Sequence, residues 1–147
     1  MKTVLADLEV FAINIMLIMF VLAGWDKATN FNRTVVDLSK HFNKLNFSPS
    51  RPIIKFLVML AIFIETAGPF AINYGITFKK YDLIVYATYT LIIYMIGATI
   101  LYFYPPFNEN FYPFISALTT VGGLIMIIAD IKYSWIFTDF SSESLLC

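Results

Sequence analysis

The sequence predicts an all-α membrane protein: a bundle of four transmembrane helices with an amphipathic interfacial helix between spans one and two. Of its 147 residues, 59% are hydrophobic and only 14% are charged, about half the charged share of an ordinary soluble domain. The charged residues leave long apolar runs between them. The formal net charge is zero, so the composition offers no basic surface for nucleic acid.

Most of the spans follow from runs that are almost free of charge. Leu83 to Tyr104 and Phe111 to Ala129 contain no charged residue, and Phe56 to Phe78 contains only Glu65. Because a helix needs about 20 apolar residues to cross a bilayer, each run is long enough for one crossing. We place these spans at about 55–77, 83–104 and 111–130.

The first span has a shorter uncharged part, Val10 to Trp25, and we place it at about 5–26. A Met-Lys start before an apolar run is also typical of a signal peptide. Asp7 and Glu9 precede the run, however, and no clear small-x-small cleavage site follows it, so we retain four spans. Residues 1–131 then form a single transmembrane domain, and residues 132–147 form a polar C-terminal tail.

The segment between spans one and two has the spacing of an amphipathic helix, at about 34–46. Thr34 is a candidate N-cap, and Pro49 and Pro52 separate this helix from the next span. The helix would either lie flat in the headgroup region or pack across the mouth of the bundle. Both arrangements use the same face, on which apolar residues recur at steps of four and three: Phe31, Val35, Leu38, Phe42 and Leu45.

Glu65 is the residue of greatest interest, because it lies in the middle of a span. A carboxylate there costs roughly 2.5–3.5 kcal/mol on insertion scales, so it usually faces the bundle interior and has a partner. Pro69 and Asn73 follow at steps of four and share its helix face. Counting depth at about 1.5 Å per residue places polar side chains of other spans near its level: Asn14, Thr90 and Tyr94.

Lys27, at the end of span one, is the cation that could reach Glu65. It can do so only if span one stays helical through it and the lysine side chain bends inward. Without a cation, burial would keep Glu65 protonated as a hydrogen-bond donor. The position fits a carboxyl that holds the helices in register and also a proton or quinone-head contact point; we favour the first.

Three short motifs resemble those of the DoxX-like family of small four-helix membrane proteins. Leu22 to Lys27, closing span one, is similar to the family's Gly-x-x-Lys, and Ile62 to Gly68 is similar to its Glu-x-x-Gly. Asn110 to Leu124 contains an Asn and then Gly-Gly-Leu, as in the family's fourth span. The resemblance covers about residues 8–130. Many members have a histidine where the third span ends, whereas this chain reads Tyr102-Phe103-Tyr104-Pro105.

The resemblance implies a four-helix bundle in which Lys27 and Glu65 are the paired polar positions. It also implies that four glycines are helix-packing sites: Gly24, Gly68, Gly122 and Gly123. Gly97 in span three has the same interpretation, because small residues let helices approach closely in lipid. Some members of the family associate with quinone-linked or other redox complexes, so a quinone is a conceivable cofactor.

The sequence contains no motif that proposes a catalytic residue, and His41, without companions, is a poor ligand for a metal ion or haem. We therefore expect a non-catalytic accessory subunit or scaffold of a membrane complex, located in a plasma or internal membrane. Its partners would be the lipid bilayer and other membrane proteins, or further copies of the chain. The alternatives are a proton-coupled carrier that uses Glu65 and a membrane receptor or assembly factor for other proteins.

Four spans place both termini on the same side of the membrane. Tags fused to the two ends should therefore be equally accessible in sealed vesicles. The first linker should lie on the opposite side, where Asn32-Arg33-Thr34 and Asn46-Phe47-Ser48 are potential glycosylation acceptors in a eukaryotic host. Tags accessible from opposite faces would overturn the four-span topology.

Overall fold

The computed structural model describes residues 2–104 and 110–143. In these ranges it contains the helices α1 (Lys2–Thr29), α2 (Phe31–Lys44), α3 (Arg51–Thr77), α4 (Tyr81–Phe103) and α5 (Phe111–Glu143). Four segments of these helices are long and apolar enough to cross a membrane: Val10–Thr29, Arg51–Thr77, Tyr81–Phe103 and Phe111–Ile131. The prediction of an all-helical protein with four membrane-length apolar helices is confirmed.

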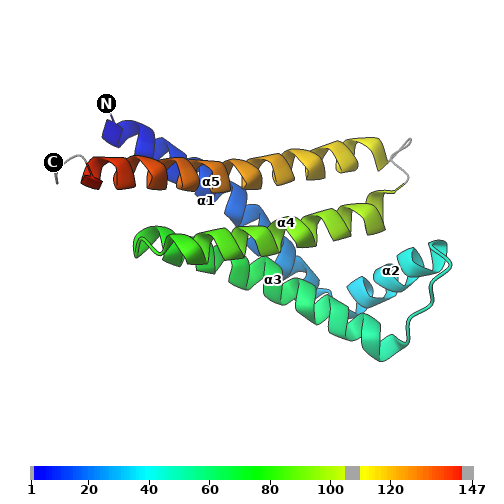
Figure 1. Cartoon of the computed structure of the whole chain (residues 1–147). Helices are drawn as coiled ribbons and strands as arrows, with labels where there is room; N and C mark the ends of the chain where they lie inside the picture. The colour runs from blue at the N-terminus through cyan, green and yellow to red at the C-terminus, as the bar shows by residue number, and fades with distance from the viewer. Residues whose placement is uncertain (1, 105–109, 144–147) are drawn as a thin grey trace.

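The four long helices pack in a chain of contacts, α1 on α3, α3 on α4 and α4 on α5. α1 crosses the others obliquely, from the C-terminal end of α5 to the N-terminal half of α3 (Figure 1). α1 begins and α5 ends at the same end of the bundle (Figure 1). Leu17, Ile72, Leu91 and Leu124 contribute to the buried core where these helices meet.

The outer faces of the membrane-length helices remain apolar and exposed. Phe63 of α3 is 67% exposed and Ile93 of α4 is 70% exposed. In water, an apolar surface of this extent would promote aggregation. In a bilayer it is the surface that contacts lipid, which explains why the chain can be so hydrophobic.

The helix bounds differ from the expected ones at several ends. α1 continues to Thr29 rather than about 26, and its last turn is tied by hydrogen bonds from Thr29 Oγ1 to the carbonyl oxygens of Trp25 and Asp26 (3.1 and 3.0 Å). α3 begins at Arg51, earlier than about 55, because Pro52 is well suited to the first turn of a helix. The helical backbone of α5 continues to Glu143 and so includes much of the segment expected as a polar tail.

α2 occupies the linker between the first two spans but begins before the predicted position. Asn30 stands at the N-cap position, and Thr34 lies inside the helix, where its hydroxyl donates to the Asn30 carbonyl oxygen at 3.2 Å. Thr34 is therefore not the N-cap. The helix also ends at Lys44, so Leu45 lies beyond it and is 47% exposed.

α2 packs on the N-terminal part of α3. Val35 and Leu38 are buried in a small apolar cluster with Ile54 and Val58 of α3. Further contacts join α2 to α4, so the helix lies across one end of the bundle formed by α3 and α4 (Figure 1). Arg33 and Lys40 remain exposed on α2.

The glycines differ in what surrounds them. A Cβ added at Gly24 would lie 3.0 Å from Thr66 Cγ2 and 3.2 Å from Glu65 Cβ, so α1 and α3 are nearly as close as a glycine allows. A Cβ added at Gly68 would lie 3.0 Å from the Leu91 side chain, and one added at Gly123 would lie 3.0 Å from the Met16 sulfur.

Gly97 and Gly122 correct the expectation that all five glycines pack helices within the chain. A Cβ at either position would meet nothing within 4 Å, because these glycines are on exposed faces of α4 and α5. The spacing of small residues indicates where a helix could approach but not which side of the helix faces its neighbours.

Gly24→Leu should destabilise the bundle, because the added side chain would force α1 away from α3. Overpacking of this kind typically costs about 1–3 kcal/mol. The measurement is the unfolding temperature of the purified protein in detergent, with Gly122→Leu as the matched control in an open position. Equal unfolding temperatures for the two variants would show that the close approach at Gly24 does not contribute to stability.

Candidate functional site

Glu65 of α3 is buried, with 3% of its surface exposed. Lys27 Nζ from α1 lies 2.6 Å from one carboxylate oxygen, Oε1, and 2.7 Å from the other, Oε2. The Tyr94 hydroxyl from α4 also donates to Oε1, at 2.7 Å. The carboxylate thus joins three membrane-spanning helices at one point.

Lys27 reaches Glu65 because of two features of α1. The helix continues through Lys27 to Thr29, which keeps the lysine backbone next to α3. Gly24 lies about one turn earlier, where a Cβ added to the glycine would lie only 3.2 Å from the Glu65 Cβ. The side chain can then bend inward along α3, and 24% of its surface stays exposed.

The cluster formed by Lys27, Glu65 and Tyr94 leaves neither carboxylate oxygen without a hydrogen-bond partner. Both carboxylate oxygens are occupied, and the charges of Lys27 and Glu65 cancel. No buried side-chain nitrogen or oxygen in the described part of the chain lacks a hydrogen-bond partner. Removing a single partner from such a buried pair is strongly destabilising, because an uncompensated charge remains in an apolar environment.

The other polar residues expected near this level do not join the cluster. Asn14 donates to the Val10 carbonyl oxygen of its own helix at 2.9 Å, and Thr90 donates likewise to Tyr86 at 2.9 Å. Asn73 makes no side-chain hydrogen bond with Glu65, although both lie on α3. The depth of each residue along the membrane normal can be estimated from the sequence. The rotation of each helix about its axis and the oblique path of α1 cannot be predicted in this way.

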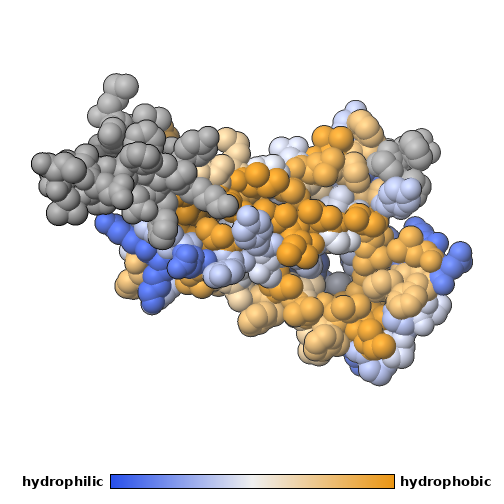
Figure 2. Space-filling model, viewed as in Figure 1, coloured by the Kyte–Doolittle hydropathy of each residue, from blue (hydrophilic) through white to orange (hydrophobic). Residues whose placement is uncertain are grey.

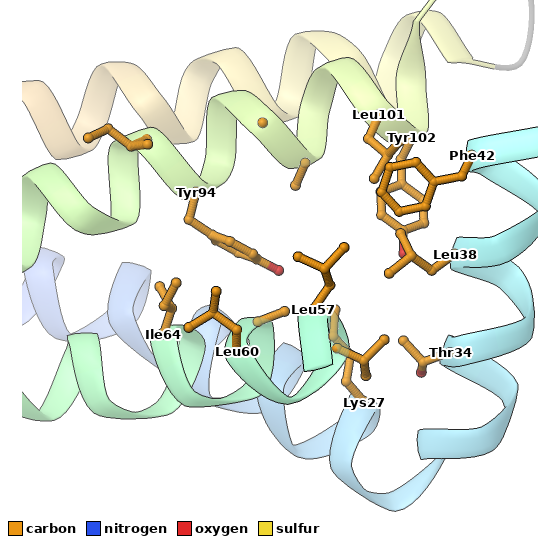
Figure 3. Close-up of a pocket in the computed structure, with 15 residues that line it drawn as sticks. Lys27, Thr34, Leu38, Phe42, Leu57, Leu60, Ile64, Tyr94, Leu101 and Tyr102 are labelled. Atoms are coloured by element: carbon orange, nitrogen blue, oxygen red, sulfur yellow. The ribbon is translucent and has the colours of Figure 1, made fainter. Parts of the chain in front are cut away.

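A cavity of about 240 Å³ lies beside the cluster, between α3 and α4 (Figure 3). Lys27 and Tyr94 form part of its wall, and α2 closes it with Leu38 and Phe42. Most of the remaining wall is apolar. Sequence reasoning missed this cavity, although Gly97-Ala98 on α4 is the available signal, since small residues leave space where no helix fills it.

Metal ligation has no support in the described ranges, where no group of three or more His, Cys, Asp and Glu side chains could hold a metal ion. His41 instead packs against the Tyr102 ring, with 4.5 Å between ring centroids, and its Nδ1 lies 2.8 Å from the Asp37 carbonyl oxygen. Comparison with models of protein families, with curated proteins and with solved structures finds no match for this chain.

The geometry predicts energetic coupling between Lys27 and Glu65. Lys27→Met should cost about 3–5 kcal/mol, because it leaves the buried Glu65 carboxylate uncompensated. Glu65→Gln should cost less, because the Lys27 side chain is 24% exposed and can turn toward water. The double variant should lose less than the sum of the two. Thermal unfolding of the three purified variants in detergent measures this difference.

Tyr94→Phe provides an internal comparison in the same experiment. It removes one hydrogen bond to the carboxylate but leaves the ion pair intact, so its cost should be smaller, about 1.5–3 kcal/mol. Strictly additive losses for Lys27→Met and Glu65→Gln would contradict the coupling.

Proposed function

We propose that the chain is a non-catalytic accessory subunit or scaffold of a membrane protein complex, of DoxX-like type. The observation that carries the proposal is the full engagement of Glu65 by Lys27 and Tyr94. A carboxylate that carries protons across a membrane must exchange its partners during each cycle. Here the partners come from two other helices, α1 and α4, so releasing them would loosen the bundle itself. The contacts of Glu65 therefore favour a structural role over proton transfer.

The DoxX-like assignment is supported by the pairing of Lys27 with Glu65. These are the polar residues of the two motifs that resemble the family, and they lie in contact. The close approach of Gly24 and Gly68 to neighbouring helices agrees with the packing roles that the resemblance implies. We further propose that the chain associates with a redox or quinone-linked complex, because some members of the DoxX-like family do so.

The outer face of α5 supports contact with another membrane protein or a second copy. Ser116, Thr119 and Gly122 are exposed there, and nothing lies within 4 Å of a Cβ added at Gly122. In lipid, small residues on an outward face allow a second helix to approach closely. We further propose that α2 lies at headgroup level, because it combines buried Val35 and Leu38 with exposed cations.

A proton-coupled carrier is the second candidate, and one observation favours it. Lys27 lines the cavity and is 24% exposed, so one member of the ion pair can be reached from outside the helical core. A ligand that entered the cavity could then compete with Glu65 for Lys27.

Two measurements on the same preparations separate these functions. The tagged chain is purified in mild detergent from its native membrane and examined for a stoichiometric partner, and the purified chain is reconstituted into vesicles for proton-flux measurements. A scaffold should retain its partner in Glu65→Gln, which keeps hydrogen bonding, and should show no flux. Gly122→Leu should lose the partner, whereas Gly97→Leu should keep it as the matched control.

A carrier would give the opposite pattern. Wild-type vesicles would conduct protons, and Glu65→Gln would abolish the flux while the protein still eluted as a single species. That result would overturn the scaffold proposal.

A further inference from the structure

We infer that the cavity between α3 and α4 binds one acyl chain of a glycerolipid, which enters sideways from the membrane leaflet on the α2 side. The ion pair and the small residues of α5 do not account for this cavity. The cavity lies between α3 and α4, whereas the proposed partner contact lies on the outer face of α5.

The position of the cavity matches the depth of one leaflet. Its wall extends along α4 from Ile93 to Tyr102, and α2 closes it at the Tyr102 end. This stretch of helix rises roughly 14 Å at about 1.5 Å per residue, close to half of the ~30 Å hydrocarbon thickness of a bilayer. An acyl chain that begins at headgroup level and ends near the midplane has this length.

The wall of the cavity favours hydrocarbon over water. Of its polar residues, Lys27 and Tyr94 are already bonded to Glu65. The Thr34 hydroxyl donates a hydrogen bond to the Asn30 carbonyl oxygen. An apolar cavity of roughly 150 Å³ can stay dry and take up benzene, and this one, at about 240 Å³, is larger. In a membrane, the abundant apolar molecule next to such a cavity is a lipid chain.

The cavity opens to the outside between α3 and α4. Leu60 and Ile93 line it and are 42% and 70% exposed. Gly97 also lines it, and a Cβ added there would meet nothing within 4 Å. The space-filling view shows a hollow surrounded by hydrophobic residues in this region (Figure 2). Gly97 therefore keeps the entrance wide.

Tyr102 gives the site its polar end. Its ring packs against His41, and its hydroxyl makes no hydrogen bond within the described ranges. In the described ranges, every buried side-chain nitrogen or oxygen has a hydrogen-bond partner. The Tyr102 hydroxyl oxygen has none, so it must be accessible from outside the protein. It lies at the α2 end of the cavity (Figure 3), where an ester carbonyl oxygen of a glycerolipid could accept its proton in a hydrogen bond.

The charge balance of the site selects a neutral group rather than an anion. Lys27 is the cation in the wall, and Glu65 already neutralises it. A fatty acid in the cavity would have to hold a carboxylate without a counter-charge in apolar surroundings or take up a proton there, and either costs free energy that an ester does not.

The test uses the full chain in phosphatidylcholine vesicles that contain phosphatidylcholine with a photoreactive diazirine in the middle of one acyl chain. After irradiation, labelled residues are identified by mass spectrometry. The wild type should carry label on cavity residues such as Leu57 and Ala98, as well as on outer residues such as Phe63. Gly97→Leu should lower the cavity labelling about tenfold by occupying the space that the chain fills. Its labelling at Phe63 should not change.

Thr90→Leu is the control, since it places a leucine at an exposed position of α4 that does not line the cavity, and its labelling should equal that of the wild type. A second comparison needs no variant. The ether-linked form of the same probe lacks the chain's ester carbonyl and should label the wild-type cavity less than the ester form, a difference that Tyr102→Phe should remove. Equal cavity labelling in the wild type and Gly97→Leu would overturn the inference, as would stronger labelling by a photoreactive free fatty acid.

Discussion

The contact of Lys27 and Tyr94 with Glu65 determines how α1, α3 and α4 meet. Between helices in a bilayer there is no hydrophobic driving force comparable to that in water, because lipid chains are as apolar as the side chains they would replace. Close packing and polar contacts must therefore specify the arrangement. A carboxylate with partners on two other helices does so at a single depth and in a single rotation of each helix.

The remaining packing is arranged around this contact. Gly24 brings α1 close enough to α3 for Lys27 to reach, and Gly68 allows α4 to approach α3 through Leu91. The apolar core at Leu17, Ile72 and Leu124 then brings α5 into the bundle. The space that remains between α3 and α4 is next to the cluster, on the side that α2 covers.

Much of this arrangement could be predicted from the sequence. Apolar runs locate the spans, since length and charge decide whether a segment can cross a bilayer. A carboxylate within a span needs a partner, so Glu65 indicated one, and Lys27 was the cation that could reach it. Asn14 and Thr90 were wrongly grouped with them, because a depth count says nothing about helix rotation, and each side chain bonds instead to its own helix. The outward position of Gly97 and Gly122 could not be predicted for the same reason.

The location of Lys27 at the end of α1 also has a consequence for biosynthesis. α1 precedes α3 along the chain, so when spans are inserted in the order of translation, α1 enters the membrane before the helix that carries Glu65. Lys27 lies within one turn of the α1 terminus, where its long side chain can extend to the headgroups and remain hydrated. When α3 is inserted, Glu65 can pair with Lys27, which already lies at the edge of the membrane. A lysine in the middle of α1 would have had to remain in the hydrocarbon without a counter-charge until α3 arrived, so the order of charges along the chain suits the order of assembly.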